Sequence, residues 1–255
     1  KKIHLEHLKA SMAKWMPAET DYQDLLACHL SLPLTSSLSR SWRAETTDRL
    51  FVCHTANTHL ETGLALHPLY GFPIIPGSSL KGIALAGLFE KQGILNKIPL
   101  TEQKISTTLL NKLVMLYPEV FTRKIINEIS LIFGIPPVAR YEFPGNEGNI
   151  VFADAWPASL KQGKLIDLDS WTSHYPDFRD NLAKYPGDDQ HPRPLLQICV
   201  GKGTGFLISV SVRKNSKLAK KAAQKTLDRA AEYLGYALTE VGAGSKTSSG
   251  YGYFN

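Results

Sequence analysis

The C-terminal third of the sequence constrains the fold most, because two strand-like runs precede one long amphipathic helix there. The runs LLQICV and FLISVSV are joined by GKGTG, which predicts a β-hairpin with a glycine turn. A helix is expected from about Lys217 to Leu238, with Ser216 as its N-cap. Its buried stripe should contain Ala223, Leu227, Ala230, Leu234 and Leu238, and its outer face Lys217, Lys220, Lys221 and Lys225.

A second helix is predicted after the stretch PGSSLKG. Apolar residues recur at helical spacing from Ser79 to about Lys91, and Ser78 or Ser79 is a natural N-cap. Because an uncovered helix N-terminus attracts anions and Lys81 lies in the first turn, the same stretch also suits phosphate. Helix cap and anion site are therefore compatible interpretations.

Strands complete the pattern on either side of these helices. Residues 22–34 and 49–55 contain apolar runs of strand length, NIVFADAW alternates like a strand, and YGYFN is a short final run. Asp154, inside NIVFADAW, is expected to cap or brace a loop. The order is strand, helix, strand, strand, helix, strand, as in the split βαβ or ferredoxin-like arrangement. We therefore expect an α+β fold with an antiparallel sheet.

The composition, with 43% hydrophobic and 20% charged residues, is that of an ordinary globular chain, which at this length allows one domain or two. The order of elements favours a single domain, spanning residues 1–255. Residues 1–48 should form an N-terminal extension and the first strand. Residues 92–148 should be a helical insertion, with helices near 102–115 and 118–133, and residues 157–194 an irregular one.

The net charge of +6 is confined to the C-terminal fifth of the chain. Residues 201–255 hold nine Lys and Arg against three Asp and Glu. Residues 1–200 hold twenty basic and twenty acidic residues, so their charges cancel. Such localised basicity favours a polyanionic partner, with a solvated helix face as the alternative. Arg40 and Arg43 add two cations in a polar segment that is expected to be a loop.

The glycine-rich stretch VGAGSKTSSG resembles a P-loop but lacks its requirements. Ser245 separates Gly244 from Lys246, and only eight residues follow Thr247, too few for the helix that holds the phosphates. An ATPase is therefore not expected. Consecutive backbone N–H groups in a glycine loop can still bind an anion. The alternative is a helix C-cap at Gly242 followed by a turn into an edge strand.

No cofactor or metal site is predicted. Cys28, Cys53 and Cys199 are far apart in the sequence, so no disulfide framework or CxxC site is indicated and a reducing cytoplasm is expected. No apolar stretch is long enough to cross a membrane. Isolated histidines such as His67 and His174 are more often structural than catalytic. The acidic residues that could attract a cation lack the spacing of an EF-hand: Asp167, Asp169, Asp188 and Asp189.

Three motifs in order, GFPIIPGSSLKG, FADAWP and VGAGSKTSSGYGYF, resemble the RAMP superfamily of CRISPR-associated RNA-binding proteins. With ETGLALHPLYG and DLDSWTSHYPDF, the pattern is most similar to the sixth Cmr subunit of type III-B effector complexes. The resemblance covers the chain from about Leu60 to its C-terminus.

The resemblance implies a ferredoxin-like (RRM-like) RAMP core with insertions. It implies a subunit that caps the backbone filament near the 3′ end of the guide RNA (crRNA) and binds its backbone without sequence specificity. The implied partners are crRNA, complementary target RNA, the repeated backbone RAMP, a small helical subunit and a RAMP at the tip. By motif match, RNA contacts are expected from Ser78, Ser79, Lys81, Gly242, Gly244, Ser245, Lys246, Thr247 and Ser248. Arg40 and Arg43 of the polar segment are added to these expected contacts.

Some RAMP proteins are ribonucleases, which leaves catalysis as an alternative. The backbone RAMP uses an Asp on a loop with a divalent metal, and the corresponding segment here offers Glu45, Asp48 and Glu61, none of which matches clearly. Other RAMP proteins use a His, for which His67 is the nearest counterpart. We expect no catalytic residue and a structural role. The alternatives are an endoribonuclease for target or precursor guide RNA and a pure protein-interaction module.

Overall fold

The computed structural model describes most of the chain. Described are residues 6–7, 10–11, 14, 16–31, 38–52, 64–98, 114–138, 144–161, 165–173, 184–185 and 193–255. Cys53, Glu61, His174, Asp188, Asp189 and most of the helix expected at 102–115 lie outside these residues. The elements are α2 (Glu19–Ser31), β1 (Ser39–Glu45), α3 (Gly77–Lys91), η2 (Leu95–Lys97), α5 (Arg123–Phe133), β2 (Gly134–Ile135), β3 (Asn146–Glu147), β4 (Ile150–Phe152), β5 (Trp156–Pro157), β6 (Asp167–Ser173), β7 (Arg193–Cys199), β8 (Gly205–Val212), α7 (Lys220–Tyr236), η5 (Ala237–Val241) and η6 (Thr247–Ser249).

The main sheet has the strand order of a ferredoxin-like fold. β8 lies between β1 and β4 and is antiparallel to both, while β5 pairs with β8 beyond the end of β4. The C-terminus extends the other edge, since Asn255 and Glu45 exchange two backbone hydrogen bonds of 3.0 and 3.1 Å. From edge to edge the order is C-terminal segment, β1, β8, β4. This confirms the α+β, antiparallel class.

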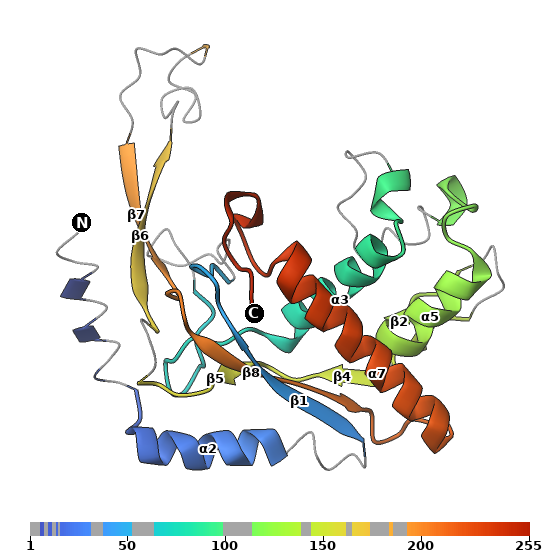
Figure 1. The fold of residues 1–255 in the computed structure, drawn as a ribbon, viewed down its shortest axis with the longest axis horizontal. Coiled ribbons are helices and arrows are strands. Elements are labelled where there is room, and N and C mark those ends of the chain that lie inside the picture. The colour runs from blue at the N-terminus through green and yellow to red at the C-terminus, as the bar shows by residue number, and fades with distance from the viewer. Residues whose placement is uncertain are drawn as a thin grey trace.

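Helices α3 and α7 cover one face of the sheet (Figure 1). Alternate residues of β8, including Phe206, Ile208 and Val210, are buried against them in the main core. The predicted stripe of α7 from Ala223 to Leu238 is buried throughout, as its 3.6-residue spacing requires. The two helices cross closely at Gly87, where a Cβ atom would lie 2.4 Å from the Tyr233 carbonyl oxygen.

The strand predicted within residues 22–34 is wrong, because the segment forms α2. Tyr22 and Leu26, spaced i, i+4, are buried with Phe72, Ile74 and Trp156 in a second cluster. In Figure 1, α2 lies on the other side of the sheet from α3 and α7. The polar segment with Arg40 and Arg43, expected to be a loop, is β1 instead.

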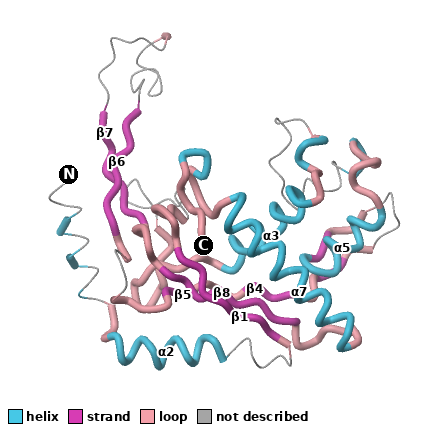
Figure 2. Tube along the Cα trace, viewed as in Figure 1, coloured by secondary structure: helices cyan, strands magenta, loops and turns pink. Residues whose placement is uncertain are grey.

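The predicted hairpin between LLQICV and FLISVSV is also wrong, although both strands exist. β7 pairs with β6, and β8 pairs with β1 and β4. The connecting turn is held against Thr46, whose backbone N–H donates to the Thr204 oxygen at 3.0 Å, so β7 and β8 diverge. The insertion at 157–194 is therefore not wholly irregular, because β6 lies in it. Figure 2 shows the β6–β7 hairpin projecting from the rest of the molecule.

The insertion at 92–148 carries α5, which ends at residue 133 as predicted and has Gly134 as its C-cap, followed by the short β2–β3 pair. The N-cap expected at Ser216 is wrong. α7 begins at Lys220 after Ala219, and the Ser216 hydroxyl donates to Asn149 Oδ1 at 2.8 Å. In the part of the chain that the structure describes, no helix has the length and apolar character needed to cross a bilayer.

Candidate nucleic-acid interface

The start of α3 is capped from a distant strand segment. The helix begins at Gly77, and the Gly77 backbone N–H donates to Asp154 Oδ1 at 2.7 Å. Asp154 therefore acts as a capping residue, as expected. Ser78 and Ser79 lie within the first turn, so the prediction that one of them is the N-cap is wrong. Gly77 is needed because a Cβ atom would lie 2.1 Å from the Phe152 oxygen of β4. Both serines remain at the surface, Ser78 exposed and Ser79 half-buried.

Lys81 lines a cavity of about 510 Å³ between the first turn of α3, the β2–β3 pair and the end of β8. Arg213, directly after β8, lines the same cavity. Its Nη1 lies 3.2 Å from Glu147 Oε2, and its Nε donates to the Gly148 oxygen at 3.0 Å. Among the described residues no carboxylate pairs with Lys81. We call these two cations and their cavity the Lys81–Arg213 pocket.

Electrostatics in the Lys81–Arg213 pocket favour an added anion. Burial lowers the pKa of the Lys81 ammonium, and the nearby charge of Arg213 lowers it further. Both effects disfavour the charged lysine in the protein alone. A bound phosphate would remove this repulsion, because it would supply the negative charge that Lys81 lacks. Arg213 was missed from the sequence, where the only signal was a basic residue immediately after a strand.

The glycine loop after α7 packs tightly onto residues 49–52. α7 runs into the π-helical turn η5, which ends at Gly242 with φ 82°. Ser245 N–H donates to the Phe51 oxygen at 2.9 Å, and a Cβ atom on Gly244 would lie 2.0 Å from that oxygen. The glycines at 242 and 244 are thus required by backbone conformation and close packing, as the C-cap interpretation predicts. Gly244 and Ser248 are exposed at the tip of the loop, and Thr247 is half-buried.

Lys246 points into the protein, toward the base of the β6–β7 hairpin. Its Nζ donates to Gln197 Oε1 at 3.0 Å, lies 3.9 Å from Asp169 Oδ2, and sits 4.4 Å from the centre of the Phe51 ring. The side chain is 18% exposed. Lys246 therefore joins the loop to the hairpin by a hydrogen bond, an ion pair and a cation–π contact.

Arg49 completes a cluster of four charges at this place. Its guanidinium lies 3.6 Å from both Asp167 Oδ2 and Asp169 Oδ1. The two aspartates, considered from the sequence as cation ligands, thus pair with Arg49 and Lys246. We call these four residues the hairpin-base cluster. The adjacent Cys199 thiol is buried, which raises its pKa to about 12, and the two aspartates add to the effect.

The other predicted RNA contacts lie on β1. Arg40 pairs with Asp228 of α7 at 2.6 Å, on the helix-covered face of the sheet. Arg43 lies on the opposite face and is 3.2 Å from Glu45. The structure does not bring the two lysine-containing motifs together. The Lys81–Arg213 pocket lies near the start of α7, and the glycine loop lies beyond the end of the same helix. The 17 residues of α7 span about 25 Å, so the helix length separates the two motifs.

Of the residues considered for catalysis, the three that the structure describes, Glu45, Asp48 and His67, have structural contacts, and Glu61 lies outside the described ranges. Asp48 Oδ1 accepts the Arg49 backbone N–H at 2.7 Å, and Glu45 pairs with Arg43. His67 Nδ1 accepts two backbone N–H groups at 3.3 Å, and burial lowers the pKa of its ring. Over the described ranges, no group of three or more His, Cys, Asp or Glu could hold a metal ion.

Comparison with known proteins identifies the class. The model of the RAMP superfamily matches residues 43–255, so the chain belongs to the RAMP superfamily. It is 26% identical to the CRISPR system Cmr subunit Cmr6 of Pyrococcus furiosus (strain ATCC 43587 / DSM 3638 / JCM 8422 / Vc1), over 98% of this chain and 80% of the relative.

A solved structure shares the fold. It is a chain of the type III-B Cmr-beta complex bound to cognate target RNA, with a TM-score of 0.61 and 17% identity, covering 100% of this chain and 72% of that one. The crystal structure of Cmr6 from Pyrococcus furiosus aligns with a TM-score of 0.45 at 26% identity, over 85% of this chain and 97% of that one.

Proposed function

We propose that this protein is a structural subunit of a type III-B CRISPR (Cmr) effector complex that holds the guide RNA by its backbone. In this role it caps the backbone filament near the 3′ end of the crRNA, in the cytoplasm. The observation that carries the proposal is the Lys81–Arg213 pocket, where a half-buried lysine beside an arginine has no carboxylate partner among the described residues. The similarity to a Cmr6 subunit and the fold shared with a chain of an RNA-bound complex support it.

Recognition of this kind would be insensitive to RNA sequence. Lys81 and Arg213 present positive charge suited to phosphate, and the Ser78 and Ser79 hydroxyls lie in the same turn of α3. Contacts to phosphate and sugar position a strand without reading its bases. This suits a guide whose bases must pair with complementary target RNA. The exposed tip of the glycine loop at Gly244 and Ser248 would contact the same strand farther along.

The salt dependence of guide-RNA binding tests the proposal. Affinity of the full chain for guide RNAs with unrelated spacers should be equal, and should fall with salt. The Lys81→Ala/Arg213→Ala variant should lower the slope of log affinity against log salt by about two, one for each lost phosphate contact. The matched control is Lys161→Ala/Lys202→Ala, which removes two exposed lysines that do not line the pocket. An unchanged slope in the first variant, or a strong preference for one spacer, would contradict the proposal.

The proposed role includes no RNA cleavage. Asp48 and His67, two of the residues considered as counterparts of catalytic residues in other RAMP proteins, are engaged in local hydrogen bonds. Incubation of the full chain with guide-paired target RNA and Mg²⁺ should leave the RNA intact. Cleavage that is lost in Asp48→Asn or His67→Ala would show that the chain is a ribonuclease instead.

A further inference from the structure

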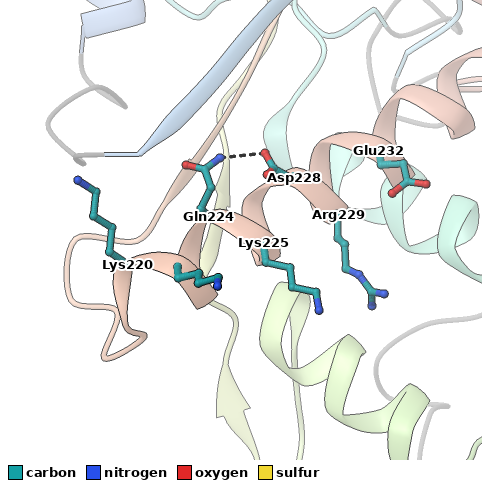
Figure 3. A pocket seen from close by; sticks show the side chains of 7 residues that line it. Lys220, Gln224, Lys225, Asp228, Arg229 and Glu232 are labelled. Atoms are coloured by element: carbon teal, nitrogen blue, oxygen red, sulfur yellow. Dashed lines mark hydrogen bonds between the residues drawn. The ribbon is translucent and has the colours of Figure 1, made fainter.

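The outer face of α7 carries positive charge that its own acidic residues do not neutralise. Figure 3 shows the side chains along this face. Each carboxylate there pairs with a cation, and two of these cations come from other elements. Asp228 pairs with Arg40 of β1, and Glu232 pairs with Lys91 of α3.

The third carboxylate lies on α5, where Glu128 pairs with Arg229 and accepts the Tyr233 hydroxyl at 2.7 Å. The nearby lysines have no such partner. Among the described residues, no side-chain hydrogen bond or ion pair engages the ammonium groups of Lys124, Lys220, Lys221 or Lys225. A net positive surface therefore faces outward along α7 and onto α5.

A groove between α5 and α7 lies beside these lysines. Its volume is about 270 Å³, and its lining includes the apolar Leu131, Ile132 and Ala222. Leu131 is 39% exposed. Lys124 and Lys225 lie at the same groove, one from each helix. An apolar groove with a cationic rim is complementary to an apolar side chain flanked by carboxylates.

The lining of the groove distinguishes between classes of macromolecule. Its volume of about 270 Å³ lies at the lower end of the range of small-molecule sites, about 300–1,000 Å³, and can hold one large apolar side chain. Binding of single-stranded RNA uses aromatic side chains on which bases stack. None of the residues that line this groove is aromatic. A protein segment therefore fits the groove better than RNA.

We propose that the α5–α7 groove binds an acidic segment of a partner protein, with one large apolar side chain inserted beside Leu131. Carboxylates on both sides of that side chain would pair with Lys124 and Lys225. This surface is separate from the Lys81–Arg213 pocket, so it gives the RNA-binding subunit a second, protein-binding face. The inference adds to the proposed function, and binding of guide RNA by the same sample tests that function independently.

Site-specific photocross-linking tests the proposal. The full chain carries p-benzoylphenylalanine at position 131, is co-expressed with the other subunits of its own complex, and is irradiated after purification. We expect a cross-link to a peptide with more Asp and Glu than Lys and Arg and with a large apolar residue at the attachment point. The same group at position 69, where Leu69 is 81% exposed, should not capture this peptide. Cross-links only to RNA, only to this chain, or to no peptide at all would overturn the proposal.

Charge reversal gives a second measure that does not depend on the cross-linker. Lys124→Glu/Lys225→Glu should lower the affinity for the cross-linked partner at least about tenfold, since like charges would then face each other. Guide-RNA affinity should stay within about twofold. The control Lys202→Glu/Lys214→Glu makes the same change of charge at exposed positions outside the groove. Equal losses of partner affinity in both variants would also contradict the proposal.

Discussion

The two ends of α7 have clusters of cations that differ in what neutralises them. Near its start, Lys81 and Arg213 share a cavity in which the exposed Glu147 pairs with Arg213, and no carboxylate of the described residues pairs with Lys81. Beyond its end, Lys246 lies within 4 Å of Asp169, which also pairs with Arg49. The first arrangement leaves positive charge for an external phosphate, whereas the second uses it to join the glycine loop to the β6–β7 hairpin. We therefore expect the first cluster to matter for RNA binding and the second for stability.

Breaking the hairpin-base cluster should have the largest effect. Asp169→Ala leaves Arg49 and Lys246 close together with one carboxylate removed, and should lower the free energy of unfolding by about 3 kcal/mol. Urea denaturation measures this value. Glu147→Ala, which removes a carboxylate that is 82% exposed, is the control and should cost less than about 0.5 kcal/mol. Equal effects would mean that the two clusters do not differ in this way.

Alkaline pH should reveal the buried Cys199 thiol beside the same cluster. Burial raises its pKa from 9.0 to about 12, so only the unfolded chain loses this proton between those values. Stability is therefore complete below pH 9 and falls as pH rises, by about 2 kcal/mol from this group between pH 9 and 10.5. Urea denaturation curves at pH 9 and 10.5 should show a smaller fall in the free energy of unfolding for Cys199→Ala than for the wild type. Cys28→Ala, at an exposed position, should behave as the wild type. If Cys199→Ala lost as much stability as the wild type over this pH range, the Cys199 thiol would not be the cause of the loss.

Removing Lys246 should have an intermediate effect on stability. Lys246→Ala deletes a hydrogen bond to Gln197 and a cation–π contact with Phe51, and should lower the free energy of unfolding by about 1 kcal/mol. Thermal denaturation at low salt is a suitable measurement. An unchanged melting temperature would show that the Lys246 ammonium does not stabilise the contact between the glycine loop and the β6–β7 hairpin.

The smallest expected effect is that of Lys81 on stability. Lys81→Gln removes the repulsion between Lys81 and Arg213, so the free energy of unfolding should rise by about 0.3 kcal/mol, or stay unchanged once solvent screening is included. Urea denaturation can compare it with Lys202→Gln, an exposed position without such a neighbour. A loss of more than about 1 kcal/mol would mean that Lys81 has a stabilising role after all.

The core helices could be predicted from the sequence because their signal is local. Apolar spacing located α3 and the buried stripe of α7, and the order of elements gave the class of fold. The pairing of β7 with β6 could not be predicted, since it depends on how the turn before β8 is held against Thr46. The strand prediction for the segment of α2 is wrong because Tyr22 and Leu26 lie in a short apolar run that suits either a strand or a helix. The residues that pack against them, such as Phe72 and Trp156, are distant in the sequence.

The candidate site could be predicted only in part for a similar reason. Lys81 was recognised from its position in the first turn of a helix. The sequence does not show which charges meet in space, so neither the proximity of Arg213 to Lys81 nor the pairing of Lys246 with Asp169 could be foreseen. Glycine and lysine in one loop suggested an anion site, yet close packing on Phe51 accounts for Gly244.

Guide-RNA binding by Lys81→Ala and Lys246→Ala, measured side by side over a range of salt concentrations, shows which of the two lysines contacts RNA phosphate. Both variants lose one positive charge from a motif that resembles a phosphate site. We expect Lys81→Ala to lower the salt slope by about one, because a phosphate contact is lost, while Lys246→Ala, at conditions where it is fully folded, keeps the slope of the wild type. The reverse result, with the slope lowered only in Lys246→Ala, would contradict this expectation.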